Sequence, residues 1–327
     1  MKLPIALILG VSALGAAAEP ADTATVDSTK TFIFTDVINI PSTSVKDQNK
    51  SGTCWCFAGT SFYEDEIRKN GGDSLDLSEM FTVRNCYRDK AERFVRMYGQ
   101  TNFAAGGSAL DVPYVWKRYG AVPEEVYSGL QYGEDKHVHG ELDAVLAAYL
   151  KEIVKKPNKK LSKAWMKGIE GILDAYLGPV PETFEYKGKT YTPKTFAESL
   201  PLNPDDYVPL TSFMHHPYYE AFAVEVPDNW LWEKYYNVPL DELKAIVDNS
   251  LAKGHTIVWA ADVSEGGFKW NKGVALMPKG KSESDMDGTE LSRWVKLSDK
   301  ERQNSKYEFE GPVEEIVVTP ETVSYTH

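Results

Sequence analysis

The chain has 327 residues, of which 42% are hydrophobic and 26% are charged, and its formal net charge is -12 at pH 7. A chain of this size and composition can bury one large core or two smaller ones, so we expect a globular protein. A surplus of acidic residues repels the phosphate backbone of DNA and RNA, which excludes nucleic acid as an expected partner.

The first 30 residues predict an exported protein. Residues 2–18 run from a lysine through an apolar stretch to three alanines, the order of a secretory signal peptide. We expect residues 1–18 to be the signal, 19–30 a flexible linker and 31–327 the folded domain. The apolar stretch is shorter than the roughly 18 to 20 residues that span a bilayer, so a retained anchor is the alternative. The predicted location is periplasmic or extracellular, with no membrane association after cleavage.

Apolar residues recur at helical spacing through the first half of the chain. The pattern predicts helices over residues 54–69, 78–86, 109–119 and 141–154. Glycines follow the first and the third of these stretches, as is typical of helix ends. The first half is therefore expected to be mostly helical.

The second half is richer in strand-forming residues. It predicts a hairpin over 184–193, strands within 212–227, a helix over 240–253, a buried strand over 255–263, a surface excursion over 280–310 and a strand at the end. Helices that precede strands along the chain favour an α+β protein with two segregated lobes.

Two of the three cysteines flank Trp55 at the start of the first predicted helix. The helix dipole and the unpaired first N–H groups lower the pKa of a thiol at this position, and the thiolate is the nucleophilic form. Gln48, six residues earlier, can donate its side-chain amide to a developing oxyanion. We therefore interpret Cys54 as a nucleophile and Gln48 as its oxyanion donor, whereas a buried structural thiol is the alternative reading.

The other two cysteines have less specific surroundings. Cys56 lies two positions after Cys54 and faces another side of the helix, which favours a place in the core. A disulfide between Cys56 and Cys86 is the alternative for an exported chain.

The remaining side chains are weaker candidates for catalytic or metal-binding roles. His137 and His139 precede a helix, and the adjacent His215 and His216 are expected to face opposite sides of a strand, so neither pair is expected to bind a metal. For His255 a packed or surface role is favoured over a catalytic role at a cleft. Asp262 is placed at the cleft by its position alone, and His327 is a weak candidate for the base because its sequence context is not diagnostic. Glu64, Asp65 and Glu66 are expected to form a solvated helix face. No metal and no cofactor is expected.

The order of these motifs resembles that of the papain-like cysteine peptidases, peptidase family C1, and most of all the bleomycin hydrolase and aminopeptidase C branch. Residues 48–55 are similar to the family's Gln-x5-Cys-Trp motif, and Leu77-Ser78-Glu79 is similar to its LSE segment. Gly106-Gly107-Ser108 and the stretch 117–123 resemble its double glycine and its YGxVP turn. The resemblance is specific over 46–132 and looser up to about residue 278.

The resemblance implies a papain-like two-lobe α+β fold, with a helical lobe and a truncated β lobe. It implies that Cys54 is the catalytic nucleophile, that Gln48 is catalytic as the oxyanion donor, and that Gly106 and Gly107 bind substrate through their backbone. The implied activity is thiol-dependent, aminopeptidase-like hydrolysis of peptide substrates through an acyl-enzyme, in a protein that forms homo-oligomers.

One part of the family pattern is absent from the printed sequence. A His followed by an Asn-Ser-Trp segment, which orients the family's catalytic base, does not occur near the end. We expect the catalytic His and Asn beyond residue 327, and the alternative is a naturally inactive protein. The rival function is therefore an exported, non-catalytic peptide-binding protein that keeps the cleft but lacks the base.

Overall fold

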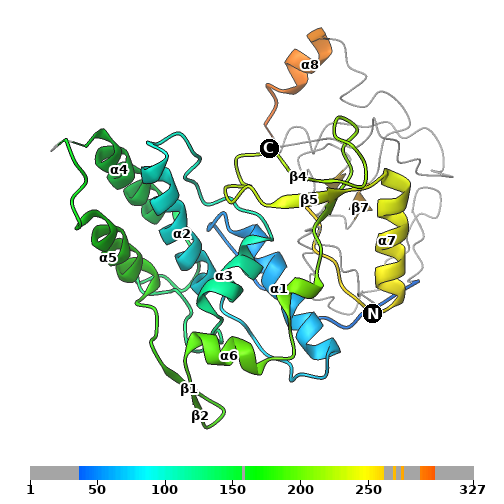
Figure 1. Ribbon diagram of the computed structural model, residues 1–327, viewed down its shortest axis with the longest axis horizontal. Coiled ribbons are helices and arrows are strands. Elements are labelled where there is room, and N and C mark those ends of the chain that lie inside the picture. The colour runs from blue at the N-terminus through cyan, green and yellow to red at the C-terminus, as the bar shows by residue number, and fades with distance from the viewer. Residues whose placement is uncertain (1–36, 157–158, 261–267, 270–273, 276–287, 299–327) are drawn as a thin grey trace, which may run out of the picture. The chain divides into compact units, whose positions relative to one another are not determined.

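The computed structural model describes residues 37–156, 159–260, 268–269, 274–275 and 288–298 (Figure 1). The chain divides into two compact units, Met1–Trp259 and Ala260–His327. The predicted signal peptide and linker, Asp262, His327 and the predicted C-terminal strand all lie outside the described residues.

The first unit contains seven α-helices and a 3₁₀ helix among its described residues. They are α1 (Cys54–Lys69), α2 (Glu79–Arg96), α3 (Asp111–Tyr119), α4 (Gly140–Lys155), α5 (Trp165–Leu177), α6 (Pro193–Ser199), η1 (Pro204–Asp206) and α7 (Leu240–Ala252). The predictions of α1, α4 and α7 are confirmed to within a residue or two. Helix α2 is longer than predicted because Tyr87, Ala91 and Val95 extend its buried face beyond Cys86.

Helices α5 and α6 were missed in the sequence. In α5, Gly168 and Gly171 weaken the helical pattern, although Ile169, Leu173 and Leu177 are buried at a spacing of four. Gly168 has a packing reason, because a Cβ at this position would overlap the Tyr149 hydroxyl of α4. Helix α6 begins after a Thr192 cap with a proline in its first turn.

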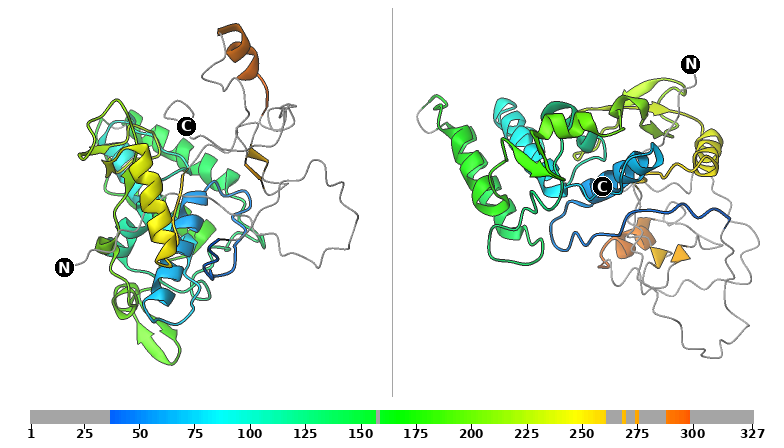
Figure 2. Two further views of the ribbon diagram at one scale, coloured as in Figure 1. Left: turned by 90° about the vertical axis from the view of Figure 1, so that its right-hand side faces the viewer. Right: turned by 90° about the horizontal axis from the view of Figure 1, so that it is seen from below.

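The core lies mainly between the first five helices. Helices α4 and α5 pack beside α2, as seen in Figure 1 and in the right view of Figure 2. The side chains with no solvent exposure in this core are Cys56, Ile67, Met80, Val83, Cys86, Ala91, Val115, Leu146, Leu150, Ile169 and Leu173. They lie on all five helices, and their periodic placement explains why the sequence pattern located α1 to α4.

The predicted hairpin is confirmed as β1 (Phe184–Tyr186) paired antiparallel with β2 (Lys189–Tyr191). Its two-residue loop, Lys187-Gly188, has positive φ angles of 47° and 73°, as a tight hairpin turn requires. A second sheet has the order β3-β5-β4, in which β3 (Leu210–Thr211) is parallel and β4 (Ala221–Ala223) antiparallel to β5 (Lys234–Asn237).

Two strand predictions need correction. Most of 212–227 is turn, bend or irregular chain, and β4 is its only strand. Over the described part of 255–263, only Val258 forms a bridge, and Trp259 is 52% exposed. The segment begins beside α1, where His255 Nδ1 lies 2.9 Å from Glu66 Oε2.

The second unit is described only in part. Strand β6 (Phe268–Lys269) pairs antiparallel with β7 (Val274–Ala275), and α8 (Gly288–Trp294) lies within the predicted surface excursion, where most of the described side chains are exposed. Across the described ranges, no helix has both the length and the apolar character needed to cross a bilayer.

Candidate active site

Cys54 is the first residue of α1 and is exposed. Two backbone hydrogen bonds to the segment 137–139 fix the loop before Cys54. Lys50 N donates to the His137 carbonyl over 2.9 Å, and His139 N donates to the Lys50 carbonyl over 3.1 Å. Gly52 has a positive φ of 66°, and a Cβ added there would lie 2.9 Å from Cβ of Ala105. Only glycine suits this turn, which brings the chain into α1.

The surroundings of the Cys54 thiol act in opposite directions. Loss of water around the sulfur is the largest effect and raises its pKa, while the backbone N–H groups of Trp55 and Cys54 lower it. The carboxylate of Asp228 raises it further. The net direction is upward, so the pKa lowering expected from the helix start is outweighed. The amides favour the thiolate as predicted, but desolvation and a nearby negative charge oppose it.

Gln48 lies half-buried in the loop that leads to Cys54. The backbone on either side of Gln48 is anchored, since Asp47 Oδ1 accepts from Asn49 N over 2.8 Å and Asp47 pairs with Lys136 at 3.6 Å. Its role as the oxyanion donor stays a prediction.

Trp55 connects Cys54 to the segment that contains Gly106 and Gly107. Its indole Nε1 donates to the Ala105 carbonyl over 3.0 Å, directly before Gly106. A Cβ on Gly107 would lie 2.8 Å from Cε2 of the same indole and 2.6 Å from Oδ2 of Asp111. Gly107 therefore has no room for a side chain, and its backbone N–H and C=O bond to no other described residue. They remain free to pair with an extended peptide.

A buried lysine, which sequence reasoning missed, supports the neighbouring glycine. Lys90 Nζ donates to the carbonyl of Gly106, and it lies 5.6 Å and 5.8 Å from the ring centroids of Trp55 and Trp230. The carbonyl of Gly106 is thus already partnered. Of the two glycines, Gly107 is better placed to pair with a substrate.

Two acidic residues beside these glycines were also missed. Asp111 is buried and accepts a 2.7 Å hydrogen bond from Nε1 of Trp230. Burial raises its pKa to about 7, although Lys90 acts against this rise. Asp228 is exposed, and its two carboxylate oxygens lie 2.5 and 2.6 Å from the position of a Cβ on Gly106. No sequence signal marks either residue, because the segment around 228 is far from Cys54 along the chain.

None of the five described histidines contributes to the pKa shift of the Cys54 thiol. His255 Nδ1 lies 2.9 Å from Glu66 Oε2, and Glu66 is twelve residues along α1 from Cys54, or roughly 18 Å at 1.5 Å per residue. This confirms the packed role expected for His255. His139 is fully buried with neither ring nitrogen hydrogen-bonded, and burial lowers its pKa to about 4.

The second histidine pair differs from the prediction. His215 and His216 lie in a turn, not on a strand, so their rings can face the same side. Their Nε2 atoms lie 3.9 and 3.4 Å from the same oxygen of Glu225.

The predicted solvated face of α1 is in fact buried. Glu64, Asp65 and Glu66 are 1%, 6% and 1% exposed. Each has a partner from a covering segment: Glu64 accepts from Lys46 Nζ at 3.0 Å, Asp65 from Ser42 Oγ at 2.8 Å and Glu66 from Tyr207 Oη at 3.1 Å. Flanking segments of the chain cover α1 here, which a helical repeat pattern does not reveal.

The three cysteines are free. Cys56 and Cys86 are fully buried, so the core role predicted for Cys56 is confirmed and the alternative disulfide does not form.

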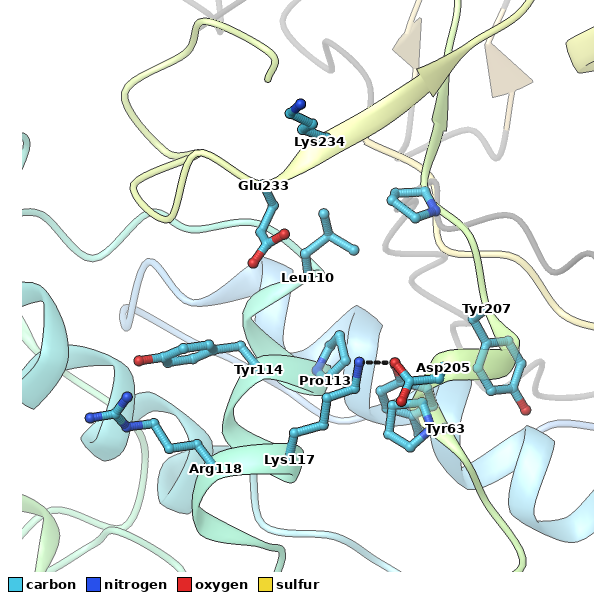
Figure 3. A pocket seen from close by; sticks show the side chains of 12 residues that line it. Tyr63, Leu110, Pro113, Tyr114, Lys117, Arg118, Asp205, Tyr207, Glu233 and Lys234 are labelled. Atoms are coloured by element: carbon cyan, nitrogen blue, oxygen red, sulfur yellow. Dashed lines mark hydrogen bonds and ion pairs between the residues drawn. The ribbon is translucent and has the colours of Figure 1, made fainter. Parts of the chain in front are cut away.

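A cavity of about 460 Å³ lies away from these residues (Figure 3). Tyr63 and Tyr207 lie on one side of it and Tyr114 and Arg118 on the other, and an ion pair joins Lys117 to Asp205. None of Cys54, Gln48, Gly106 and Gly107 lines this cavity.

Comparison with known proteins gives consistent results. Aminopeptidase C of Listeria monocytogenes is 24% identical over 265 residues, which cover 69% of this chain and 60% of the relative. Aminopeptidase C of Streptococcus thermophilus is 21% identical over 276 residues, covering 72% and 62%. The chain thus spans about three fifths of the length of these curated relatives.

The fold is also found in a solved structure. The crystal structure of PepW from Lactobacillus rhamnosis HN001 matches with a TM-score of 0.53 and 22% identity, over 68% of this chain and 59% of PepW. This likeness and the mixed helices and sheets agree with the predicted papain-like α+β fold. A sequence model of the Peptidase C1-like family matches residues 8–287. The chain therefore belongs to the Peptidase C1-like family.

Proposed function

We propose that the protein hydrolyses peptide bonds through an acyl-enzyme on Cys54 and acts on substrates with a free amino end. The carrying observation is that Cys54 begins α1 with two backbone amides on its sulfur, while its neighbour Trp55 fixes the strand of Gly106 and Gly107. Relatives named Aminopeptidase C support the aminopeptidase-like form of this reaction.

The chemistry assigns a role to each residue. The Cys54 thiolate attacks the carbonyl carbon of a peptide held along Gly107, and the Gln48 amide donates to the oxyanion. The C–N bond then breaks, the amine leaves with a proton from a general acid, and water hydrolyses the thioester. None of the described histidines supplies that proton from contact with Cys54.

The test is hydrolysis of an aminoacyl coumarin amide by the full chain. Cys54→Ala should abolish turnover. Gln48→Ala should lower kcat by about 10²–10³-fold with little change in KM, because an oxyanion donor acts mainly in the transition state. Gln100→Ala, the same change at an exposed glutamine outside this loop, is the control. Turnover that survives Cys54→Ala would refute the proposal.

The second candidate function is a peptide-binding protein without catalysis. It is favoured by the raised pKa of the Cys54 thiol. In that case the wild-type chain and Cys54→Ala would bind a peptide with equal affinity, and neither would release product over days.

We also propose that the protein is exported. The lysine, apolar and small-residue order of 2–18 supports this. Mass spectrometry of protein recovered from the producing cell should show a start at Glu19, and an intact Met1 end would contradict export by cleavage.

A further inference from the structure

The exposed carboxylate of Asp228 lies beside Gly106, one of the two glycines proposed to bind substrate. Its oxygens are in contact range of Gly106, and its charge acts on Cys54. Among the described residues, Asp228 forms no ion pair and no hydrogen bond. A negative charge that opposes the thiolate and is not neutralised by an ion pair is unfavourable for a cysteine nucleophile.

Hydrogen bonds from Asn229 and Trp230 fix the backbone of the segment that carries Asp228. The Asn229 side chain donates to the carbonyls of Val224 and Glu233 at 2.9 and 3.0 Å, and its Oδ1 accepts from Glu233 N at 3.0 Å. Trp230 then fastens the segment to Asp111 of α3. The backbone of the segment is therefore held in place, and the Asp228 carboxylate lies beside Gly106 without a loop movement.

A substrate with a free amino end would reduce the repulsion between the Asp228 carboxylate and the Cys54 thiolate. A peptide paired with Gly107 runs past Gly106, so an ammonium group within one or two residues of the scissile bond comes close to Asp228. The ammonium would neutralise the carboxylate, and its charge would also favour the thiolate. We propose that Asp228 binds the α-ammonium group of peptide substrates and restricts the enzyme to the amino end. This inference rests on the proposed peptidase function.

Binding to the Cys54→Ala chain tests this inference without requiring turnover. Calorimetric titrations at pH 7, where α-amino groups are mostly protonated, compare Leu-Gly-Gly with its N-acetylated form. The free peptide should bind at least about tenfold more tightly, as expected for a charged hydrogen bond of about 1.5 kcal/mol or more. Asp228→Asn should remove this preference and leave the acetylated peptide unchanged.

Asp248→Asn is the matched control, since Asp248 is an exposed aspartate on α7 and the change in net charge is the same. A preference that survives Asp228→Asn, or equal binding of both peptides by the parent chain, would overturn the inference. So would failure of both peptides to bind. The peptidase proposal is judged separately, by Cys54-dependent hydrolysis, so that the two can fail independently.

A second observation is independent of the cleft. The ligand atoms of His215, His216 and Glu225 all lie within 4.8 Å of one another. The ring of His216 stacks on Phe222 of β4 at 3.7 Å between centroids and 16° between planes, which fixes its orientation. Tetrahedral zinc with bonds of 2.0–2.1 Å places its ligand atoms about 3.3 Å apart, close to the 3.4 and 3.9 Å between the imidazoles and the carboxylate.

We infer that these three side chains bind Zn²⁺, with water in the fourth position. Calorimetric titration of the untagged Cys54→Ala chain with ZnCl₂ should give one site per chain. His215→Ala and Glu225→Gln should each weaken it at least tenfold, and Glu220→Gln, an exposed neighbour, should not. No binding by the parent, or equal binding by all variants, would overturn the assignment.

Discussion

Nε1 of Trp230 donates to Oδ2 of Asp111 over 2.7 Å, which joins two positions 119 residues apart in the sequence. Both groups are buried. The bond connects the segment that carries Asp228 to the first turn of α3, beside the Gly107 backbone. The segment that carries Asp228 and the turn of α3 beside Gly107 are thus joined by this one hydrogen bond.

Removing this bond should destabilise the protein. Trp230→Phe keeps a ring against Tyr114 but leaves the buried Asp111 without its donor, so the free energy of unfolding should fall by about 1–3 kcal/mol. Urea denaturation measures the change. Trp259→Phe, at a tryptophan that is 52% exposed, should change stability by less than half as much. Equal effects would show that the hydrogen bond contributes little.

Substitution by alanine should affect the stability of the protein differently at Gly106 and at Gly107. At Gly107 the added methyl meets the buried Trp55 ring and Asp111, neither of which can move away, so Gly107→Ala should cost about 1–3 kcal/mol. At Gly106 it meets only the end of the exposed Asp228 side chain, which can rotate.

A third glycine serves as the control for this series. Nothing lies within 4 Å of a Cβ on Gly171 in α5, so Gly171→Ala should stabilise by about 0.5–1 kcal/mol. Thermal denaturation should therefore rank Gly171→Ala above wild type, then Gly106→Ala, then Gly107→Ala. A less stable Gly106→Ala than Gly107→Ala would contradict the packing described here.

Local patterns were sufficient to predict part of the fold. Helices α1, α4 and α7 have periodic apolar faces and clear end signals, and the hairpin has its turn at Lys187-Gly188, so each could be predicted from neighbouring residues alone. Helix α5 was hidden because Gly168, which the close approach of Tyr149 requires, reads as a helix breaker.

The residues of the candidate site could likewise be predicted only in part from the sequence. The motif around Gln48 and Cys54 is contiguous and therefore readable. Lys90, Asp111 and Asp228 reach Gly106 and Gly107 from α2, α3 and the segment after β4, and only the tertiary fold brings them together. The raised pKa of Cys54 follows mainly from burial of the sulfur and then from the charge of Asp228, neither of which the helix-start argument contained.

A buried ionic cluster beneath α1 gives a pH-dependent prediction. Lys46 Nζ lies 3.0, 2.5 and 2.8 Å from carboxylate oxygens of Glu64, Asp76 and Glu79. Burial raises the pKa of Glu79 to about 7, and Lys46 opposes that rise. Lys46→Met should destabilise by about 3–5 kcal/mol at pH 8, because it leaves buried carboxylates without a cation.

The effect of Lys46→Met should shrink as the pH falls. A carboxyl group whose folded pKa is raised stabilises the folded state most at low pH and least above its folded pKa. At pH 5 the orphaned groups protonate, so the variant should recover part of its loss in urea titrations. Lys244→Met, at an exposed residue of α7, should show no such recovery. A pH-independent difference would contradict the role of the cluster.

The buried His139 should make the protein sensitive to acid. Its pKa is lowered to about 4, mainly by burial and then by His137. Above pH 6.5 the ring is neutral in both the folded and the unfolded state. Between pH 6.5 and 4 the unfolded chain binds a proton that the folded chain does not, so stability falls as the pH falls.

His139→Phe removes this titration. Between pH 6.5 and 5 the wild type should lose about 2 kcal/mol relative to the variant, at about 1.4 kcal/mol per pH unit. Tyr132→Phe, which alters a ring packed on His139 but titrates nothing in this range, should shift stability by a constant amount. A constant offset for His139→Phe as well would mean that the ring is protonated in the fold.

Thiol labelling tests the environment of Cys54. Under native conditions iodoacetamide should modify one thiol per chain, because Cys54 is exposed while Cys56 and Cys86 are buried, and all three should react in denaturant. Since only the thiolate reacts and the pKa of Cys54 is raised, its rate should keep rising above pH 8.5. Asp228→Asn removes one of the groups that raise this pKa, so its profile should move to lower pH, whereas that of Asp248→Asn should not. Full reactivity of the wild type at pH 6 would show that a cation activates the sulfur without substrate, and the opposing role of Asp228 would then be wrong.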